Sequence, residues 1–122
     1  MSDADTGLAV APFVPCNDYD VSRAFYLDLG WRNAFENDQL IRFRAGTATF
    51  YLQRYQWPQD AIGHYMLQLD VIDLAPWWAR AEPLGQKYGV RVIPPVDEPW
   101  GSRIFRIVDP CGVLWHVSQR LG

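Results

Sequence analysis

The sequence has few of the features of a secreted, membrane-spanning or nucleic-acid-binding protein. Its two cysteines, Cys16 and Cys111, lie far apart and form no metal-type spacing, so we expect a reduced, cytoplasmic protein. No apolar run approaches the roughly 20 residues that a membrane helix needs, and the polar, acidic first seven residues are unlike a secretory signal. A net charge of −3 argues against binding to a phosphate backbone. We therefore expect neither a membrane nor a nucleic acid as a partner.

The usual catalytic motifs are also missing. There is no glycine-rich phosphate loop and no nucleophile elbow, and Cys111 has no histidine beside it in the sequence. Aromatic residues, by contrast, are abundant: Trp, Tyr and Phe number six each, 15% of the chain. Such side chains fill cores, and they also line sites for flat ligands. With 122 residues, 49% of them hydrophobic, the chain is expected to form one domain spanning 1–122.

A repeated pattern divides the chain into two similar halves. Asp18 is followed twelve residues later by Gly30, and Asp73 is followed at the same distance by Gly85. Each segment follows an apolar, strand-like run and ends in Leu-Gly. Asp at the start (Asp18 or Asp20 in the first half) can cap a helix, and Gly supplies the left-handed residue that ends one. We therefore predict two modules, at about 8–55 and 64–119, each with the element order βαβββ.

Apolar and alternating runs predict the strands of both modules. The expected strands are 10–16, 31–35, 40–44 and 47–53 in the first module, and 65–71, 90–93, 103–108 and 113–118 in the second. The second helix is expected to bury Trp77, Trp78, Ala81 and Leu84. Pro94-Pro95 is expected to open a loop. Together these elements predict an α+β fold of two curved, mainly antiparallel sheets, with helices outside and a concave face as the natural pocket.

Three segments carry motifs of a known family. The first, 12–31, combines an Asp, a Ser, Phe-Tyr and Leu-Gly; the second is Val71-Ile-Asp73-Leu74. The third joins Pro99-Trp100-Gly101 to Asp109-Pro110, Gly112 and Trp115-His116. Over roughly residues 9–119 the chain resembles the glyoxalase / bleomycin-resistance / extradiol-dioxygenase superfamily, also called the vicinal oxygen chelate fold. The third segment is very similar to the closing segment of bleomycin-resistance proteins.

The resemblance implies that a catalytic member would hold a divalent metal on inward-facing strand residues, usually His and Glu. The corresponding positions here fall near Ala11, near Met66 and on His116. Alanine cannot coordinate, and methionine is a poor ligand for a hard divalent ion. His64, two residues before Met66, is the other candidate ligand, although it also fits an exposed residue at a strand start. Because a catalytic site normally needs three protein ligands, we expect no metal and no other cofactor.

This missing ligand set favours a binding protein over an enzyme. The resemblance then implies a metal-free protein that sequesters a bleomycin-type or other aromatic natural product. The alternative is a metal-dependent lyase, isomerase, dioxygenase or thiol transferase of the same superfamily. A third possibility is a member that has lost ligand binding and acts through dimerisation.

The expected ligand groove is centred on Trp100, which lies in a loop between Pro99 and Gly101. Its ring either forms a wall of the groove or plugs the end of the sheet. If Arg103 faces the groove, strand alternation brings Phe105 to the same face. The residues expected to bind the ligand are Trp100, Gly101, Arg103, Phe105, Phe35, Leu40, Tyr51 and His116.

The charge of the ligand stays open at this point. A cationic tail would be attracted by carboxylates, and the candidates are Glu36, Asp38, Asp60, Asp97 and Glu98. An anionic compound would instead suit Arg42, Arg44, Arg103 and Arg106.

We also expect a homodimer, because a single copy leaves the edges of two curved sheets open. Pro12 matches the proline that, in bleomycin-resistance proteins, lies at the hinge of an exchanged N-terminal strand. The resemblance therefore implies that residues before Pro12 cross to the partner and that the groove lies at the dimer interface.

Overall fold

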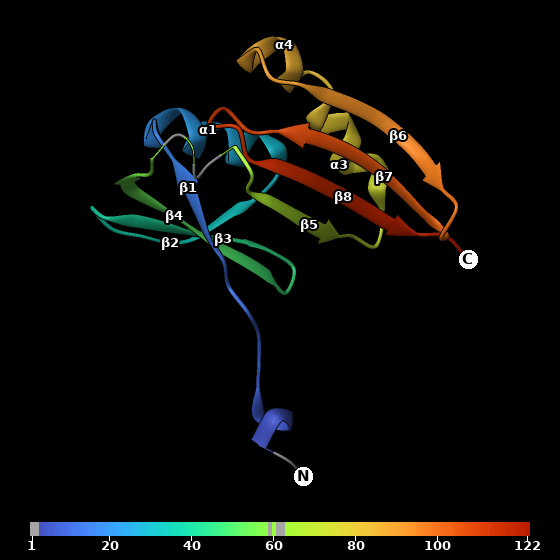
Figure 1. Cartoon of the computed structure of the whole chain (residues 1–122), viewed down its shortest axis with the longest axis horizontal. Helices are drawn as coiled ribbons and strands as arrows, with labels where there is room; N and C mark the ends of the chain where they lie inside the picture. Colours follow the sequence, from blue (N-terminus) through green and yellow to red (C-terminus); the bar gives the residue numbers. More distant parts are fainter. Residues whose placement is uncertain (1–2, 59, 61–62) are drawn as a thin grey trace.

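The structure, a computed structural model, describes residues 3–58, 60 and 63–122 (Figure 1). Its elements, in chain order, are η1 (Asp3–Thr6), β1 (Phe13–Cys16), α1 (Tyr19–Leu29), β2 (Arg32–Glu36), β3 (Leu40–Ala45), β4 (Ala48–Gln56), β5 (Met66–Asp70), α3 (Leu74–Ala81), α4 (Leu84–Tyr88), β6 (Val92–Glu98), β7 (Ser102–Val108) and β8 (Leu114–Arg120). None of the helices in these residues is long and apolar enough to cross a membrane.

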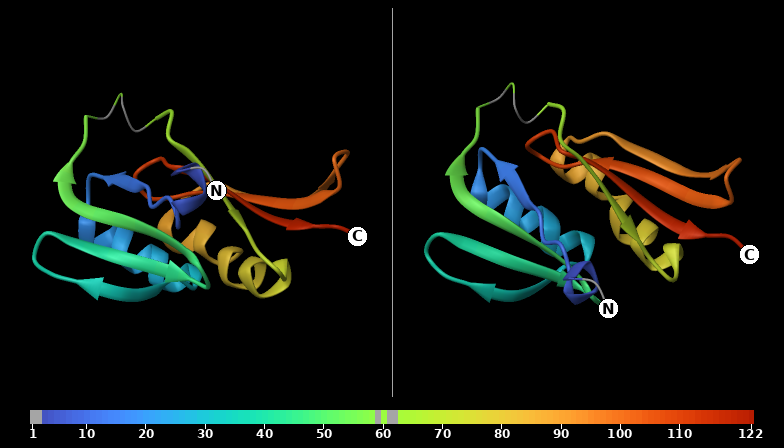
Figure 2. Two further views of the ribbon diagram at one scale, coloured as in Figure 1. Left: turned by 90° about the horizontal axis from the view of Figure 1, so that it is seen from below. Right: turned by 60° about the horizontal axis from the view of Figure 1, so that its bottom comes forward.

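The strands form two four-stranded sheets with the same topology, which confirms the predicted α+β fold. Sheet 1 has the order β1-β4-β3-β2, and sheet 2 has the order β5-β8-β7-β6. In each sheet the first strand of the module pairs in parallel with the fourth, and the remaining pairs are antiparallel. Figure 2 shows the two sheets as separate layers that splay apart, with the helices gathered beside them.

The start and end of α1 follow the predicted capping pattern. Asp18 is the N-cap, since its carboxylate accepts a hydrogen bond of 3.2 Å from the backbone N–H of Val21. Gly30 has a φ of 113° and ends the helix in the left-handed region. Between them, Phe25, Tyr26 and Leu29 are buried at helical spacing, so α1 covers one face of sheet 1.

The second helix differs from its prediction. It ends at Ala81, and a separate short helix, α4, runs from Leu84 to Tyr88 and is capped by Gly89, whose φ is 65°. The predicted stop, Gly85, lies inside α4. The interruption follows from Pro83, which has no N–H to donate to the preceding turn. Gly85 instead permits a close approach, because a Cβ there would lie 3.1 Å from Cγ2 of Val92 on β6.

Strand β6 also differs from its prediction. It continues through Pro94 and Pro95 to Glu98, where the sequence suggested a loop. Because β6 is an edge strand of sheet 2, its prolines need not donate to a second neighbour. The pairing register with β7 shifts between Ile93 and Val96, so the bulge falls on the two prolines.

An aromatic cluster joins the two modules. The Tyr26 ring of α1 contacts Phe50 of β4 and Trp115 of β8, with ring centroids 4.8 and 5.9 Å apart. Nε1 of Trp115 donates to the Tyr26 hydroxyl at 2.9 Å, and this hydroxyl donates to the buried carboxylate of Asp109. Burial raises the pKa of both Tyr26 and Asp109. Residues far apart in the sequence thus share one desolvated polar network.

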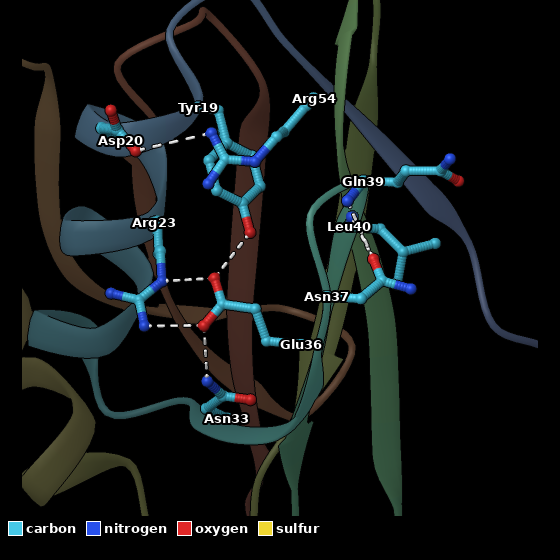
Figure 3. A network of polar contacts seen from close by, with 9 residues as sticks. All are labelled: Tyr19, Asp20, Arg23, Asn33, Glu36, Asn37, Gln39, Leu40 and Arg54. Atoms are coloured by element: carbon cyan, nitrogen blue, oxygen red, sulfur yellow. Dashed lines mark hydrogen bonds and ion pairs between the residues drawn. The ribbon is translucent and has the colours of Figure 1, made fainter.

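On the helix side of sheet 1, Glu36 anchors β2 to α1 (Figure 3). Its carboxylate accepts hydrogen bonds from Nε and Nη2 of Arg23 and from the Tyr19 hydroxyl, all at 2.8 Å, and from the Asn33 amide at 3.0 Å. The Arg23 hydrogen bonds lower the pKa of Glu36 from 4.5 to about 2. This carboxylate is therefore already engaged and turned away from the opposite face of the sheet.

Glu36→Gln is expected to lower the free energy of unfolding at pH 7 by about 1–2 kcal/mol, because charge-assisted hydrogen bonds are lost at a partly exposed site. Since the folded-state pKa lies below its usual value, the wild-type advantage exists above pH 4.5 and disappears as the pH falls to about 2. Urea denaturation of both proteins across this range measures the difference. Asp38→Asn, an exposed charge removal in the adjacent turn, is the control. A pH-independent difference would contradict this account.

Candidate functional site

Sheet 1 has a helix-covered face and an uncovered face. On β3, the buried Ile41 and Phe43 point toward α1, and the alternate residues Leu40, Arg42 and Arg44 point away from it. We call this second side of sheet 1 its uncovered face.

Four side chains form one row across the uncovered face of sheet 1. Phe13 pairs in register with Tyr51, Tyr51 with Arg42, and Arg42 with Phe35, so the row crosses β1, β4, β3 and β2. The Phe13 and Tyr51 rings are stacked, with centroids 4.7 Å apart and planes inclined by 14°. Phe13 is 43% exposed and Phe35 is 54% exposed. We refer to these residues as the aromatic–arginine row.

Three of the predicted ligand-binding residues meet on this face. Phe35 and Tyr51 lie in the row, and Leu40 lies on the same face of β3, two residues from Arg42. Phe13 was not predicted. Its place next to Val14 in the predicted strand 10–16 was the available signal, but the sequence did not show which of the two side chains faces the core.

On sheet 2, His116 lies on the side facing away from the helices. It pairs in register with Arg106 and with Gln68, and it borders a cavity of about 300 Å³. The cavity is lined by Gly63, Arg91, Ile93, Arg106, Val108, Gly112, Leu114 and His116. Burial and the neighbouring Arg106 cation lower the pKa of His116. Arg106 in turn forms an ion pair of 3.1 Å with Glu98.

Trp100 lies in the turn between β6 and β7, at one end of sheet 2. Its side chain is 67% exposed, so the ring does not plug the core. Gly101 has a φ of 92°, which places the ring at the tip of the turn, and its N–H donates to the carbonyl of Glu98 at 3.0 Å. The ring borders a cavity of about 430 Å³ whose lining is Asp70, Val71, Trp100, Ser102, Ser118 and Arg120.

Arg103 and Phe105 do not lie on the face of sheet 2 that carries His116. They share a strand face, as alternation requires, but that face is the one covered by helix α3. Phe105 is fully buried and its ring lies 5.3 Å from that of Trp78. Arg103 forms an ion pair of 2.6 Å with Asp97. Phe105 thus packs in the core, and Arg103 binds a neighbouring strand.

The side chains at the family's metal positions do not fit a divalent ion. Ala11 precedes β1, Met66 pairs with an apolar residue, and His64 is exposed in the turn before β5. His116 has the cationic Arg106 as its strand neighbour, which disfavours a second cation. In the described part of the chain, no three His, Cys, Asp or Glu side chains gather in a metal-type cluster.

The two cysteines are buried free thiols rather than reactive ones. Burial raises the pKa of Cys16 to about 12 and that of Cys111 to about 11, so both remain protonated at neutral pH. Sγ of Cys16 also donates to the carbonyl of Gln53 at 3.0 Å.

Comparison with known proteins identifies the family. The model of the Glyoxalase/Bleomycin resistance protein/Dioxygenase superfamily matches residues 9–117. The chain belongs to this superfamily. No curated protein matches this member of the superfamily.

Several solved structures share the superfamily fold with this chain. A bleomycin-binding protein complexed with bleomycin is 24% identical, with a TM-score of 0.76 over 93% of this chain and 99% of the other. TnmS3, an antibiotic binding protein from Streptomyces sp. CB03234, is 24% identical, with a TM-score of 0.71 over 94% and 98%. Lactoylglutathione lyase from Agrobacterium tumefaciens is 22% identical, with a TM-score of 0.68 over 91% and 92%. The fold is therefore shared by binding proteins and an enzyme, and the likeness by itself shows the fold.

Proposed function

We propose that this protein binds a flat aromatic small molecule and sequesters it without changing it chemically. The observation that carries the proposal is the aromatic–arginine row, where three aromatic rings lie on a sheet face that none of the described helices covers. Clustered, exposed aromatic side chains of this kind typically mark a ligand or partner surface. The bleomycin-binding and antibiotic-binding proteins of the same fold support this reading.

The proposal places the groove at the interface of a homodimer. Residues 3–11 form an N-terminal arm that runs away from both sheets (Figure 1). On this arm the side chains of Leu8 and Val10 are 100% and 90% exposed. Burial of exposed apolar side chains against a second copy of the chain would stabilise a dimer. This supports an exchange in which residues before Pro12 cross to the partner subunit.

Ligand titration followed by tryptophan fluorescence tests this function. Bleomycin and a panel of aromatic natural products would be added to the purified protein. Each bound compound would then be recovered, and its mass would be measured by mass spectrometry. We expect saturable, stoichiometric binding and recovery of the unchanged compound. Conversion of the compound into a product would support the metal-dependent enzyme instead, and the absence of any binding by folded protein would reject the proposal.

We further propose that the groove uses Trp100 together with strand residues from both subunits. Trp100→Ala is then expected to weaken binding of the tightest panel compound by about tenfold, through lost stacking and contact area. Because the ring is largely exposed, the melting temperature should change by no more than about 2 °C. Affinity and melting temperature are measured on one sample. Leu27→Ala, a truncation of a partly exposed residue on α1, is the control and should leave affinity unchanged. Unchanged affinity in stable Trp100→Ala protein would remove Trp100 from the site.

A further inference from the structure

We propose that the preferred ligand is an aromatic anion, with its negative group bound by Arg42 and its ring held by the neighbouring aromatic side chains. The inference rests on the proposed function and adds the charge of the ligand. It concerns the uncovered face of sheet 1.

The first support is the order of side chains in the aromatic–arginine row. Arg42 lies between Tyr51 and Phe35, each its direct register partner on an adjacent strand. Strands lie about 4.8 Å apart, and Cβ atoms of directly opposed residues about 5 Å. A flat ring stacked on either aromatic side chain therefore brings a carboxylate substituent within reach of the guanidinium. The stacked Phe13 extends the ring surface beyond Tyr51.

The second support is an uncompensated positive charge on β2 and β3. Arg44 lies two residues from Arg42 on the same face, and it pairs in register with Arg32. Like charges placed directly opposite each other destabilise a sheet. Within residues 3–58, 60 and 63–122, no carboxylate forms an ion pair with any of these three arginines. In a protein whose net charge is −3, this positive surface is a local feature that an anion from outside would stabilise.

The third support is that three of the five carboxylates considered for a cationic ligand already have partners. Glu36 follows Phe35 directly but turns to the other face, where Arg23 and Tyr19 bind it (Figure 3). Asp97 is paired with Arg103, and Glu98 with Arg106. Among the residues on the four strands of sheet 1, the charged side chains on the uncovered face are thus Arg32, Arg42 and Arg44, whereas Asp38 lies outside the strands, in the turn between β2 and β3.

Three probes with one ring system and different charges test the inference: 2-naphthoate, 2-naphthalenemethanol and 2-naphthylmethylamine. Their dissociation constants are measured by isothermal titration calorimetry at low and high salt. We expect the carboxylate to bind about tenfold more tightly than the alcohol and the amine to bind most weakly, because a hydrogen-bonded charge contributes more than a neutral contact. Added salt should reduce the advantage of the carboxylate.

Matched variants locate the effect. Arg42→Gln should remove the roughly tenfold preference for naphthoate and leave the affinity for the alcohol unchanged. Arg54→Gln makes the same charge change on the opposite face of sheet 1, where Arg54 lies over the Tyr19 ring. This variant should still bind naphthoate more tightly than the alcohol. Melting temperatures confirm that both variants are folded.

The remaining outcomes separate this inference from the proposed function. Equal binding of all three probes, or tightest binding of the amine, would overturn the charge preference while keeping a ligand-binding protein, provided that Tyr51→Leu weakens the binding. If Arg42→Gln changes the oligomeric state and leaves naphthoate affinity intact, the row is a contact between subunits and the inference is wrong. Folded protein that binds neither these probes nor the natural-product panel would reject both proposals.

Discussion

Replacing Asp109 by alanine is expected to lower the free energy of unfolding by about 3–5 kcal/mol, and the melting temperature by about 10 °C or more. Asp109 is only 1% exposed. Its Oδ1 accepts hydrogen bonds of 2.9 Å from the backbone N–H groups of Cys111 and Val113, and its Oδ2 accepts one from the Tyr26 hydroxyl. Alanine would leave these donors buried without an acceptor, in the turn between β7 and β8 and in the contact between modules.

Two matched variants divide this effect. Asp109→Asn keeps an Oδ1 that can accept from the turn and should lose less stability than the alanine variant. Tyr26→Phe keeps the turn but removes the hydroxyl that Trp115 donates to, so it should also be intermediate. Thermal unfolding monitored by circular dichroism measures all three. A melting temperature for Asp109→Ala within about 2 °C of wild type would show that this network contributes little.

A double substitution in the N-terminal arm, Leu8→Asp with Val10→Asp, is expected to convert the proposed dimer into a monomer. Burial of each apolar side chain contributes about 1.5–3 kcal/mol, and the two-fold axis doubles the number, so the dissociation constant should rise by a factor of about 1,000 or more. Light scattering during size-exclusion chromatography at micromolar concentration measures the mass.

The arm also supplies its own control. In an extended segment Ala9 points to the side opposite Leu8 and Val10, so Ala9→Asp should leave most of the dimer intact. A wild-type protein that is already monomeric would contradict the exchange, and so would a double variant that remains dimeric.

Features set by local chemistry were predictable from the sequence. The Asp18 cap and the Gly30 stop depend on a few adjacent residues, and both are where the pattern places them. The prediction that the helix stops at Gly85 was wrong, because a Leu-Gly pair does not occur only at the end of a helix. Glycine also permits close packing, and here it lies against Val92 after a proline has already interrupted the helix.

The candidate site was only partly predictable. Alternation along a strand shows which residues share a face, but it does not show which of the two faces is left uncovered by helices. Phe105 follows the same rule as Tyr51, yet Trp78 on α3 covers it. The side of a strand that a helix will cover is decided by tertiary packing. For the same reason, the row formed by Phe13, Tyr51, Arg42 and Phe35 exists only once four strands are in register.

Prolines lie in two of the four outermost strands, and they limit how the sheets of two chains can pair. Pro15 lies in β1 and Pro94-Pro95 in β6, and both strands are outermost in their sheets. A fibril grows when an outer strand offers a continuous row of N–H donors to the next chain. These strands cannot offer that row. Sheet-to-sheet polymerisation through β1 and β6 is therefore disfavoured, whereas β2 and β5, the other two outermost strands, contain no proline.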